Sequence, residues 1–118
     1  CLITPALIDA LIDACVGDEV GGLLAQRLVD TLKREEGGRV AATLERHDKW
    51  LAQTPQMFRL GMLLQALERA GPTLTDEAGA IEALGHHPLL VPGGTQNFKV
   101  TYPEDFALAE AVLKGRQR

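Results

Sequence analysis

The chain has 118 residues, of which 46% are apolar and 24% charged, a balance typical of one globular domain. Its net charge is −4 and its basic residues are scattered, which argues against a nucleic-acid partner, while no apolar run approaches the roughly 20 residues that a transmembrane helix needs. Two cysteines do not make a disulfide framework, so we expect reduced thiols at Cys1 and Cys15 and a soluble, cytoplasmic protein without a membrane partner.

The first elements are a helix and a strand. Thr4 and Pro5 predict a helix start, with Thr4 as N-cap and Pro5 at the first helical position, and Gly17 ends this helix. The apolar run from Val20 to Ala25 predicts a buried strand. The predicted apolar face of the helix consists of Leu7, Leu11, Ala14 and Cys15.

A polar hairpin follows. Residues 29–34 and 39–46 favour β structure, and the Gly37-Gly38 pair between them is typical of a hairpin turn. Charged side chains dominate this segment, and a polar two-stranded ribbon is marginally stable alone. We therefore expect the hairpin to project from the body and to find support from another chain.

The second half of the chain predicts three more helices and two short strands. Thr54-Pro55 and Thr75 open helices in this interpretation, and Pro103 begins the last one. Leu89–Val91 and Phe98–Thr101 are the predicted strands. The apolar faces expected for the first and last of these helices are Leu60, Leu63, Leu64 and Leu67, and Phe106, Ala109 and Leu113.

Strands that alternate with helices indicate an α/β sheet. The first element is a helix, whereas such a sheet usually begins with a strand, and the short strands barely supply a surface for that helix to cover. The chain is therefore interpreted as the second half of a larger domain.

Few residues suggest chemistry, and each has a plainer explanation. Thr54 and Thr75 are N-cap candidates that could also face a phosphate at a helix start. Lys99 follows Asn97 and Phe98 in a predicted strand, where either a phosphate or solvent would answer its charge. Arg46 has a guanidinium suited to bidentate phosphate binding, or is one more surface arginine.

No complete active site is evident. His47, His86 and His87 lack the spacing of metal ligands, so no metal site is assigned. The sequence contains no GxGxxG or GxxxxGKS phosphate loop and no GxSxG motif.

Several segments in order resemble one family. They are Asp30-Thr31-Leu32-Lys33, the hairpin ending at Arg46, Trp50 with Thr54-Pro55-Gln56, Leu74-Thr75-Asp76-Glu77-Ala78, Asn97-Phe98-Lys99-Val100-Thr101 and Pro103-Glu104-Asp105. Together they resemble the 2-C-methyl-D-erythritol 4-phosphate cytidylyltransferases of the non-mevalonate isoprenoid pathway, over residues 1–118. The resemblance covers the family's C-terminal half and implies a partial Rossmann-like nucleotidyltransferase sheet with a projecting β-hairpin arm, residues 29–46. The N-terminal CTP-binding half has no counterpart in these residues.

The resemblance implies roles for five residues. Lys99 and Arg46 match positions that place the substrate phosphate, and Thr31, Thr54 and Thr75 match threonines that line the same pocket. Thr31 and Arg46 are expected to enter the active site of a second subunit through the arm, which implies a homodimer. No catalytic residue is assigned, because the groups that stabilise the transition state belong to the other half.

The implied reaction joins CTP and methylerythritol phosphate, releases pyrophosphate and uses Mg²⁺, whose ligands lie outside this chain. The 118 residues alone are expected to be inactive. Arg27 stands where the family usually has Pro, which leaves the exact path of the arm open. Two other hypotheses are a non-catalytic dimerisation module and a related cytidylyltransferase that acts on another alditol phosphate.

Overall fold

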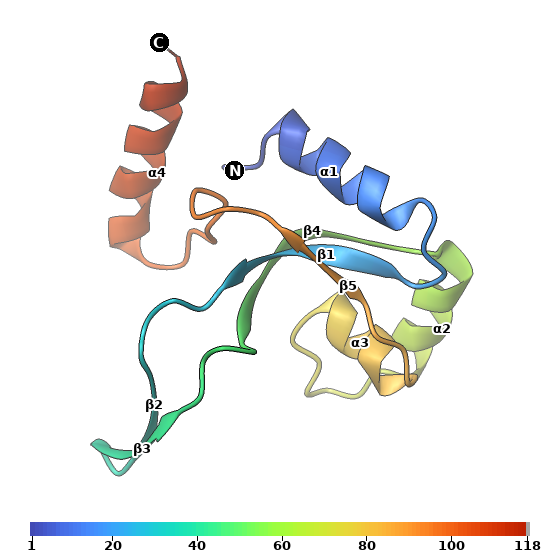
Figure 1. Ribbon diagram of the computed structural model, residues 1–118, viewed down its shortest axis with the longest axis horizontal. Helices are drawn as coiled ribbons and strands as arrows, with labels where there is room; N and C mark the ends of the chain where they lie inside the picture. The colour runs from blue at the N-terminus through green and yellow to red at the C-terminus, as the bar shows by residue number, and fades with distance from the viewer. Residues whose placement is uncertain (118) are drawn as a thin grey trace.

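The computed structural model describes residues 1–117 and contains a small α/β body from which a hairpin and the last helix extend (Figure 1). Among these residues, no helix has the length and apolar character needed to span a membrane. The elements in chain order are α1 (Pro5–Cys15), β1 (Gly21–Arg27), β2 (Leu32–Glu36), β3 (Arg39–Leu44), β4 (Trp50–Phe58), α2 (Leu60–Arg69), α3 (Glu77–Ala83), β5 (Leu89–Pro92) and α4 (Pro103–Arg116).

The body is built on a mixed three-stranded sheet in the order β4-β1-β5. β1 pairs with β4 antiparallel and with β5 parallel. The central strand begins Gly-Gly-Leu-Leu-Ala, and these five residues are all buried, as the apolar run in the sequence predicted. Two parallel strands need a crossover connection between them. The connection from β1 to β5 contains the hairpin, β4, α2 and α3. The predicted α/β class is confirmed.

Helices cover both sides of the sheet (Figure 1). On one side, Leu11 and Cys15 of α1 pack against Leu24 and Val91. On the other side, Ala66 of α2 packs with two residues of α3 in a second cluster that includes Phe58 of β4. The sheet thus has a core on each face although only three strands compose it.

Local signals placed the first helix and the hairpin correctly. Thr4 caps α1, and its Oγ1 accepts a hydrogen bond from the Leu7 amide at 3.3 Å. Gly37 and Gly38 both have positive φ, 58° and 79°, between β2 and β3. Such a pair of positive φ angles suits the twist of a two-residue hairpin turn, and glycine adopts them without steric cost.

The helix predicted to start at Thr54-Pro55 is wrong. Residues 50–58 instead form β4, and α2 begins only at Leu60. Thr54-Pro55 is a cis peptide bond, and Pro55 lies on an outer strand of the described sheet, where its lack of an amide proton is tolerated. Pairing with β1 on both sides of Thr54-Pro55 therefore overrides a local signal that resembles the true helix start at Thr4-Pro5.

Two further predictions in this half are wrong. Phe98–Thr101 is not a strand; it lies in an irregular loop between β5 and α4. Thr75 does not cap α3, because Asp76 takes that position and accepts from the Gly79 amide at 2.8 Å. An aspartate is at least as good an N-cap as threonine and stands one residue nearer the helix.

The predicted apolar faces are only partly buried. Ala14 of α1 is exposed, and so are Leu60, Leu64 and Leu67 of α2. Of the predicted α2 face only Leu63 packs inward, beside Met62 and Ala66. On α4 only Ala109 is buried, while Phe106 and Leu113 are exposed. Helical spacing identifies apolar stripes but does not say which stripe meets the body.

Asp18 gives the body a pH-dependent contact. Its carboxylate oxygen Oδ2 accepts hydrogen bonds from the Val20 and Gly21 amides, both at 2.9 Å, at the start of β1. The Gly21 hydrogen bond first, then that of Val20, lowers the pKa of Asp18 below its ordinary value of 3.8.

Because the pKa of Asp18 is lowered by folding, its contribution to stability is present above pH 3.8 and is lost as the pH falls through the lower, folded value. We expect Asp18→Asn to flatten the fall of the urea midpoint below about pH 4. Asp9→Asn, at an exposed position of α1, is the matched control. A midpoint that falls equally steeply in wild type and Asp18→Asn would contradict the assignment.

Candidate functional site

A cavity of about 1070 Å³ opens where β4, the start of α3 and the loop between β5 and α4 come together. Part of its wall is apolar, with side chains that include Ile3, Ile8, Phe98 and Phe106. Eight polar residues also line it, and they are Gln53, Thr54, Gln56, Thr75, Asp76, Glu77, Asn97 and Lys99. The cavity thus brings together three of the five residues that the sequence analysis proposed.

Thr54 reaches this cavity because β4 is irregular at that point. Leu23 pairs with Gln56, whereas Ala25 pairs with Ala52, so residues 53–55 of β4 face the single residue Leu24 of β1. Such bulges commonly re-aim side chains beside a functional site. Thr54 is therefore placed by a bulged strand and not, as predicted, by a helix cap.

Gln56 connects β4 to the start of α3. Its Oε1 accepts from the Ala78 amide at 2.9 Å, and its Nε2 donates to Asp76 Oδ2 at 3.1 Å and to the Gln53 carbonyl at 3.3 Å. Asp76 Oδ1 caps α3 at the same time. These bonds fix the residue that precedes Asp76, which is Thr75, at the cavity wall.

We expect Asp76→Ala to destabilise the protein by about 1–3 kcal/mol, because the α3 cap is lost and the Gln56 amide loses an acceptor. Asp76→Asn retains a capping oxygen and should lose less. Urea unfolding midpoints of both variants, with Asp9→Ala on the exposed surface of α1 as control, check this expectation. An Asp76→Ala protein as stable as the control would contradict it.

Lys99 is exposed and lies in the irregular loop, at the cavity. Asn97, two residues earlier in the same loop, is buried, whereas Lys99 is exposed. The loop is held at its far end by Asp105, whose Oδ2 accepts from the amides of Thr101 and Tyr102 at 2.9 Å each. These two hydrogen bonds lower the pKa of Asp105 below its usual range.

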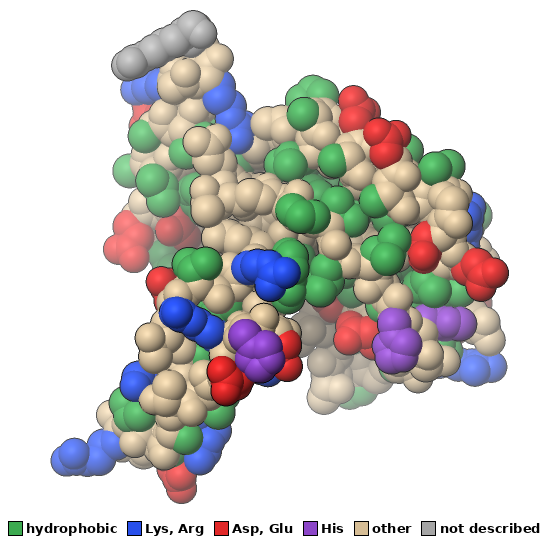
Figure 2. All heavy atoms as spheres, viewed as in Figure 1, with side chains coloured by type: hydrophobic (Ala, Val, Ile, Leu, Met, Phe, Trp, Pro, Cys, Tyr) green, Lys and Arg blue, Asp and Glu red, His purple; other side chains and the backbone are tan. Residues whose placement is uncertain are grey.

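Thr31 and Arg46 lie away from this cavity, on the projecting hairpin. Both are exposed, and an Arg46 guanidinium nitrogen donates to the Val29 carbonyl. We call residues 29–46 the arm. Figure 2 shows it as a separate projection with Lys and Arg side chains along its length. The structure therefore separates the five predicted residues into a pocket group and an arm group.

The arm joins the body at residues 27–28 and 46–50, which we call its root. Backbone hydrogen bonds and charged side chains hold this root together. The Leu28 amide donates to the Lys49 carbonyl, and the Lys49 amide donates to the Arg46 carbonyl. The Arg27 guanidinium lies over the Trp50 ring, 4.7 Å from its centroid, on the last pair of the β1–β4 ladder. A cation over an indole face is attractive.

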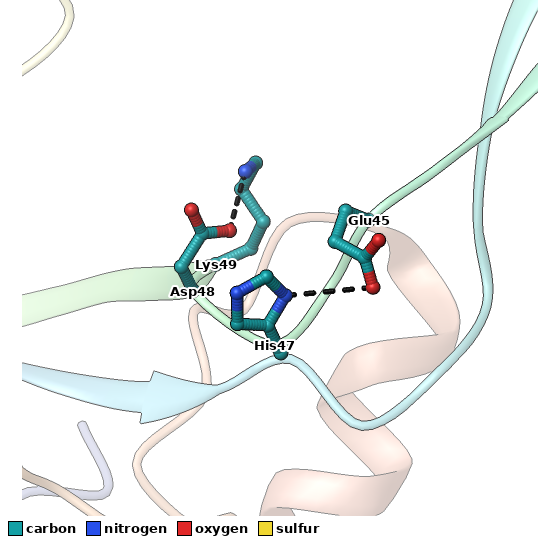
Figure 3. Close-up of polar contacts among 4 residues, drawn as sticks. All are labelled: Glu45, His47, Asp48 and Lys49. Carbon is teal, nitrogen blue, oxygen red and sulfur yellow. Dashed lines mark hydrogen bonds and ion pairs between the residues drawn. The ribbon is translucent and has the colours of Figure 1, made fainter.

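Polar side-chain contacts lie on the surface at this root (Figure 3). His47 Nδ1 lies 3.4 Å from Glu45 Oε1, and Lys49 Nζ lies 2.6 Å from Asp48 Oδ1. The Lys49 hydrogen bond lowers the pKa of Asp48. All four side chains are largely exposed, so these pairs contribute little to stability.

Within residues 1–117, no group of three or more His, Cys, Asp and Glu side chains could hold a metal ion. Two amides, Gln56 and Asn97, take part in the geometry of the cavity although sequence reasoning gave them no role. Both stand inside motifs that carried the family resemblance, and that position was the available signal.

Comparisons with known proteins give a consistent result. A family model described as IspD, 2-C-methyl-D-erythritol 4-phosphate cytidylyltransferase, matches residues 1–115. The chain is 72% identical over 116 residues to the bifunctional enzyme IspD/IspF of Albidiferax ferrireducens, which covers 98% of this chain and 28% of that protein. It is 59% identical over 118 residues to the 2-C-methyl-D-erythritol 4-phosphate cytidylyltransferase of Paraburkholderia phytofirmans, which covers 94% of this chain and 50% of that protein.

The fold agrees with the sequence match. A crystal structure of 4-diphosphocytidyl-2C-methyl-D-erythritol synthase superposes with a TM-score of 0.86 at 41% identity, covering 96% of this chain and 52% of that one. The chain thus spans about half the length of the single-function relatives it matches. These shares give the extent of the match, and the assignment to the C-terminal half stays a prediction.

Proposed function

Since the chain belongs to the 2-C-methyl-D-erythritol 4-phosphate cytidylyltransferase family, we propose that it supplies the sugar-phosphate pocket and the dimer contact of such an enzyme. The complete protein would form 4-diphosphocytidyl-2-C-methyl-D-erythritol from CTP and 2-C-methyl-D-erythritol 4-phosphate. Pyrophosphate leaves as the sugar phosphate attacks the α-phosphorus of CTP. The observation that carries this proposal is the convergence of Thr54, Thr75 and Lys99 on one cavity.

The lining of the cavity suits a branched sugar phosphate. Lys99 offers a positive charge, and Thr54 and Thr75 offer hydroxyl donors, all of which favour a phosphate dianion. The apolar wall that includes Ile3 and Phe106 offers a surface for the C-methyl branch. Holding the attacking phosphate in place lowers the barrier by positioning, and neutralising its charge lets it approach the nucleotide.

The arm supports the proposal of a homodimer. Val29, Val40 and Leu44 are 68%, 63% and 40% exposed on a segment rich in charged side chains, and a second chain would cover them. An arm that reaches a second subunit would bring Thr31 and Arg46 to the neighbour's pocket, since both lie outside the pocket of their own chain. Two shared sites would then form in each dimer.

Magnesium enters only through the family resemblance. Asp76 and Glu77 are the carboxylates that line the cavity, and the two oxygens of Asp76 are already engaged with Gly79 and Gln56. Residues 1–117 therefore do not fit a Mg²⁺ site, and no step is assigned to an ion held by them. We propose that its ligands lie elsewhere in the protein and on the substrate phosphates.

The full-length protein that contains this chain provides the test. We expect pyrophosphate release from CTP in the presence of 2-C-methyl-D-erythritol 4-phosphate, with ribitol 5-phosphate at least tenfold poorer in kcat/KM. A preference for ribitol 5-phosphate would favour a cytidylyltransferase for another alditol phosphate. No turnover with either compound would favour a dimerisation module without catalytic activity.

A further inference from the structure

Asn97 is the buried polar residue of the described core, with only 9% of its surface exposed. Its Nδ2 donates to the Thr54 carbonyl at 2.8 Å and to Gln53 Oε1 at 3.3 Å. Gln53 in turn donates through Nε2 to the Gly94 carbonyl at 2.9 Å. Both acceptors of Asn97 belong to the bulged part of β4, so this amide ties the loop that follows β5 to the bulge.

The packing around this network leaves little room for an alternative arrangement. Gly93 is buried, and a Cβ at that position would collide with Gln53 Oε1 and lie 3.1 Å from Leu24 Cβ. The loop backbone at Gly93 therefore packs directly against the Gln53 side-chain amide and against Leu24 of β1. An amide that is buried in such a place costs free energy unless its hydrogen bonds are made, and here both N–H donors of Asn97 have acceptors.

The consequence concerns two pocket residues at once. Asn97 binds the backbone of Thr54 directly and stands two residues before Lys99 in the same loop. At the other end, Asp105 holds Thr101 and Tyr102. Hydrogen bonds therefore hold the segment that bears Lys99 on both sides, through Asn97 and through Asp105. Asn97 also binds the backbone of Thr54.

We propose that Asn97 is a positioning residue that holds Lys99 and Thr54 at the mutual distance needed to bind the sugar phosphate. This inference rests on the proposed function of the pocket and adds the residue that determines its geometry. Both N–H donors of the Asn97 side chain are used within the protein, so its assigned role is positioning and not binding. Asn97 acts by fixing the separation between the Lys99 ammonium group, on a loop, and the Thr54 hydroxyl, on a strand.

Steady-state kinetics on the full-length protein test the proposal. We expect Asn97→Ala to raise KM for 2-C-methyl-D-erythritol 4-phosphate at least fivefold and to leave KM for CTP within twofold of wild type. Thr95→Ala, at an exposed position of the same loop, is the matched control and should leave both constants unchanged. Equal increases in the two KM values would overturn the proposal, because general loss of structure affects both substrates.

A double-mutant cycle with Lys99→Ala separates positioning from stability. If Asn97 acts through Lys99, adding Asn97→Ala to Lys99→Ala should raise KM by less than half of the factor that it produces in wild type. Fully multiplicative effects would overturn this inference and leave the proposed function intact. A Lys99→Ala variant with wild-type KM would overturn the proposed pocket itself.

A second variant covers the case in which Asn97→Ala does not fold. Asn97→Ser keeps a donor in a smaller side chain that is too short to reach the Thr54 carbonyl, and it should show the same selective rise in KM for the sugar phosphate. A serine variant with both KM values at wild-type level would overturn the proposal.

Discussion

Replacing Lys99 with Ala is expected to raise KM for 2-C-methyl-D-erythritol 4-phosphate by about 10- to 100-fold in the full-length protein. A hydrogen bond to a charged group contributes about 1.5–3 kcal/mol, and each 1.4 kcal/mol corresponds to a factor of ten in binding. Lys99 is the lysine that lines the cavity, and as a compact charge on a flexible stem it suits a phosphate. Initial rates at varied sugar phosphate and saturating CTP measure the change.

Lys114→Ala is the control for this substitution. Lys114 lies on α4, pairs with Glu110 at 2.7 Å and does not line the cavity. Its removal should leave KM unchanged. Lys99→Arg should restore part of the affinity, because it retains the charge but presents a larger, planar group. Equal KM values for Lys99→Ala and wild type would show that the loop does not bind the phosphate.

Replacing Arg46 with Ala should lower kcat/KM by the same factor of about 10 to 100, because the proposed dimer places Arg46 in the pocket of the neighbouring subunit. An Arg46→Ala homodimer loses the arm's guanidinium at both sites. Mixing Arg46→Ala chains with Lys99→Ala chains should then restore activity, because each heterodimer contains one pocket with an intact Lys99 that receives an intact Arg46. In a random mixture about one quarter of the wild-type activity is expected, since about half of the dimers are mixed and one of their two sites is intact.

The mixing experiment has a clear opposite outcome. If Arg46 served the pocket of its own chain, no site in any mixture would hold both groups, and activity would stay at the level of the separate variants. Arg39→Ala, near the tip of the arm and exposed, controls for a general effect of charge loss on the arm. Sedimentation of the wild-type protein and of each variant tests the proposed dimer and whether the substitutions preserve it.

Local signals in the sequence predicted the elements whose structure is decided locally. Thr4-Pro5 and Pro103 start helices, and Gly37-Gly38 makes the hairpin turn, because capping and positive φ depend on neighbouring residues. Thr54-Pro55 carries the same signature as Thr4-Pro5 and forms part of a strand. Only the pairing of β4 with β1, which is distant in sequence, distinguishes the two cases.

The candidate site was predictable to a similar degree. Lys99, Thr54 and Thr75 were chosen by residue type and family resemblance, and they do meet in one cavity. The elements that carry them were wrong, since a bulged strand and an irregular loop replace a helix start and a strand. Asn97 had no role from sequence because its two acceptors stand more than 40 residues earlier, and nothing local indicates that contact.

The stacking of Arg27 on Trp50 at the root of the arm makes the chain a natural fluorescent reporter. Trp50 is its single tryptophan, and it stands where the arm leaves the body. Indole emission responds to the charges and solvent around the ring, so a change in the direction of the arm alters the signal at its source. The proposed association of two chains through the arm can therefore be tested in solution by dilution, without any added dye.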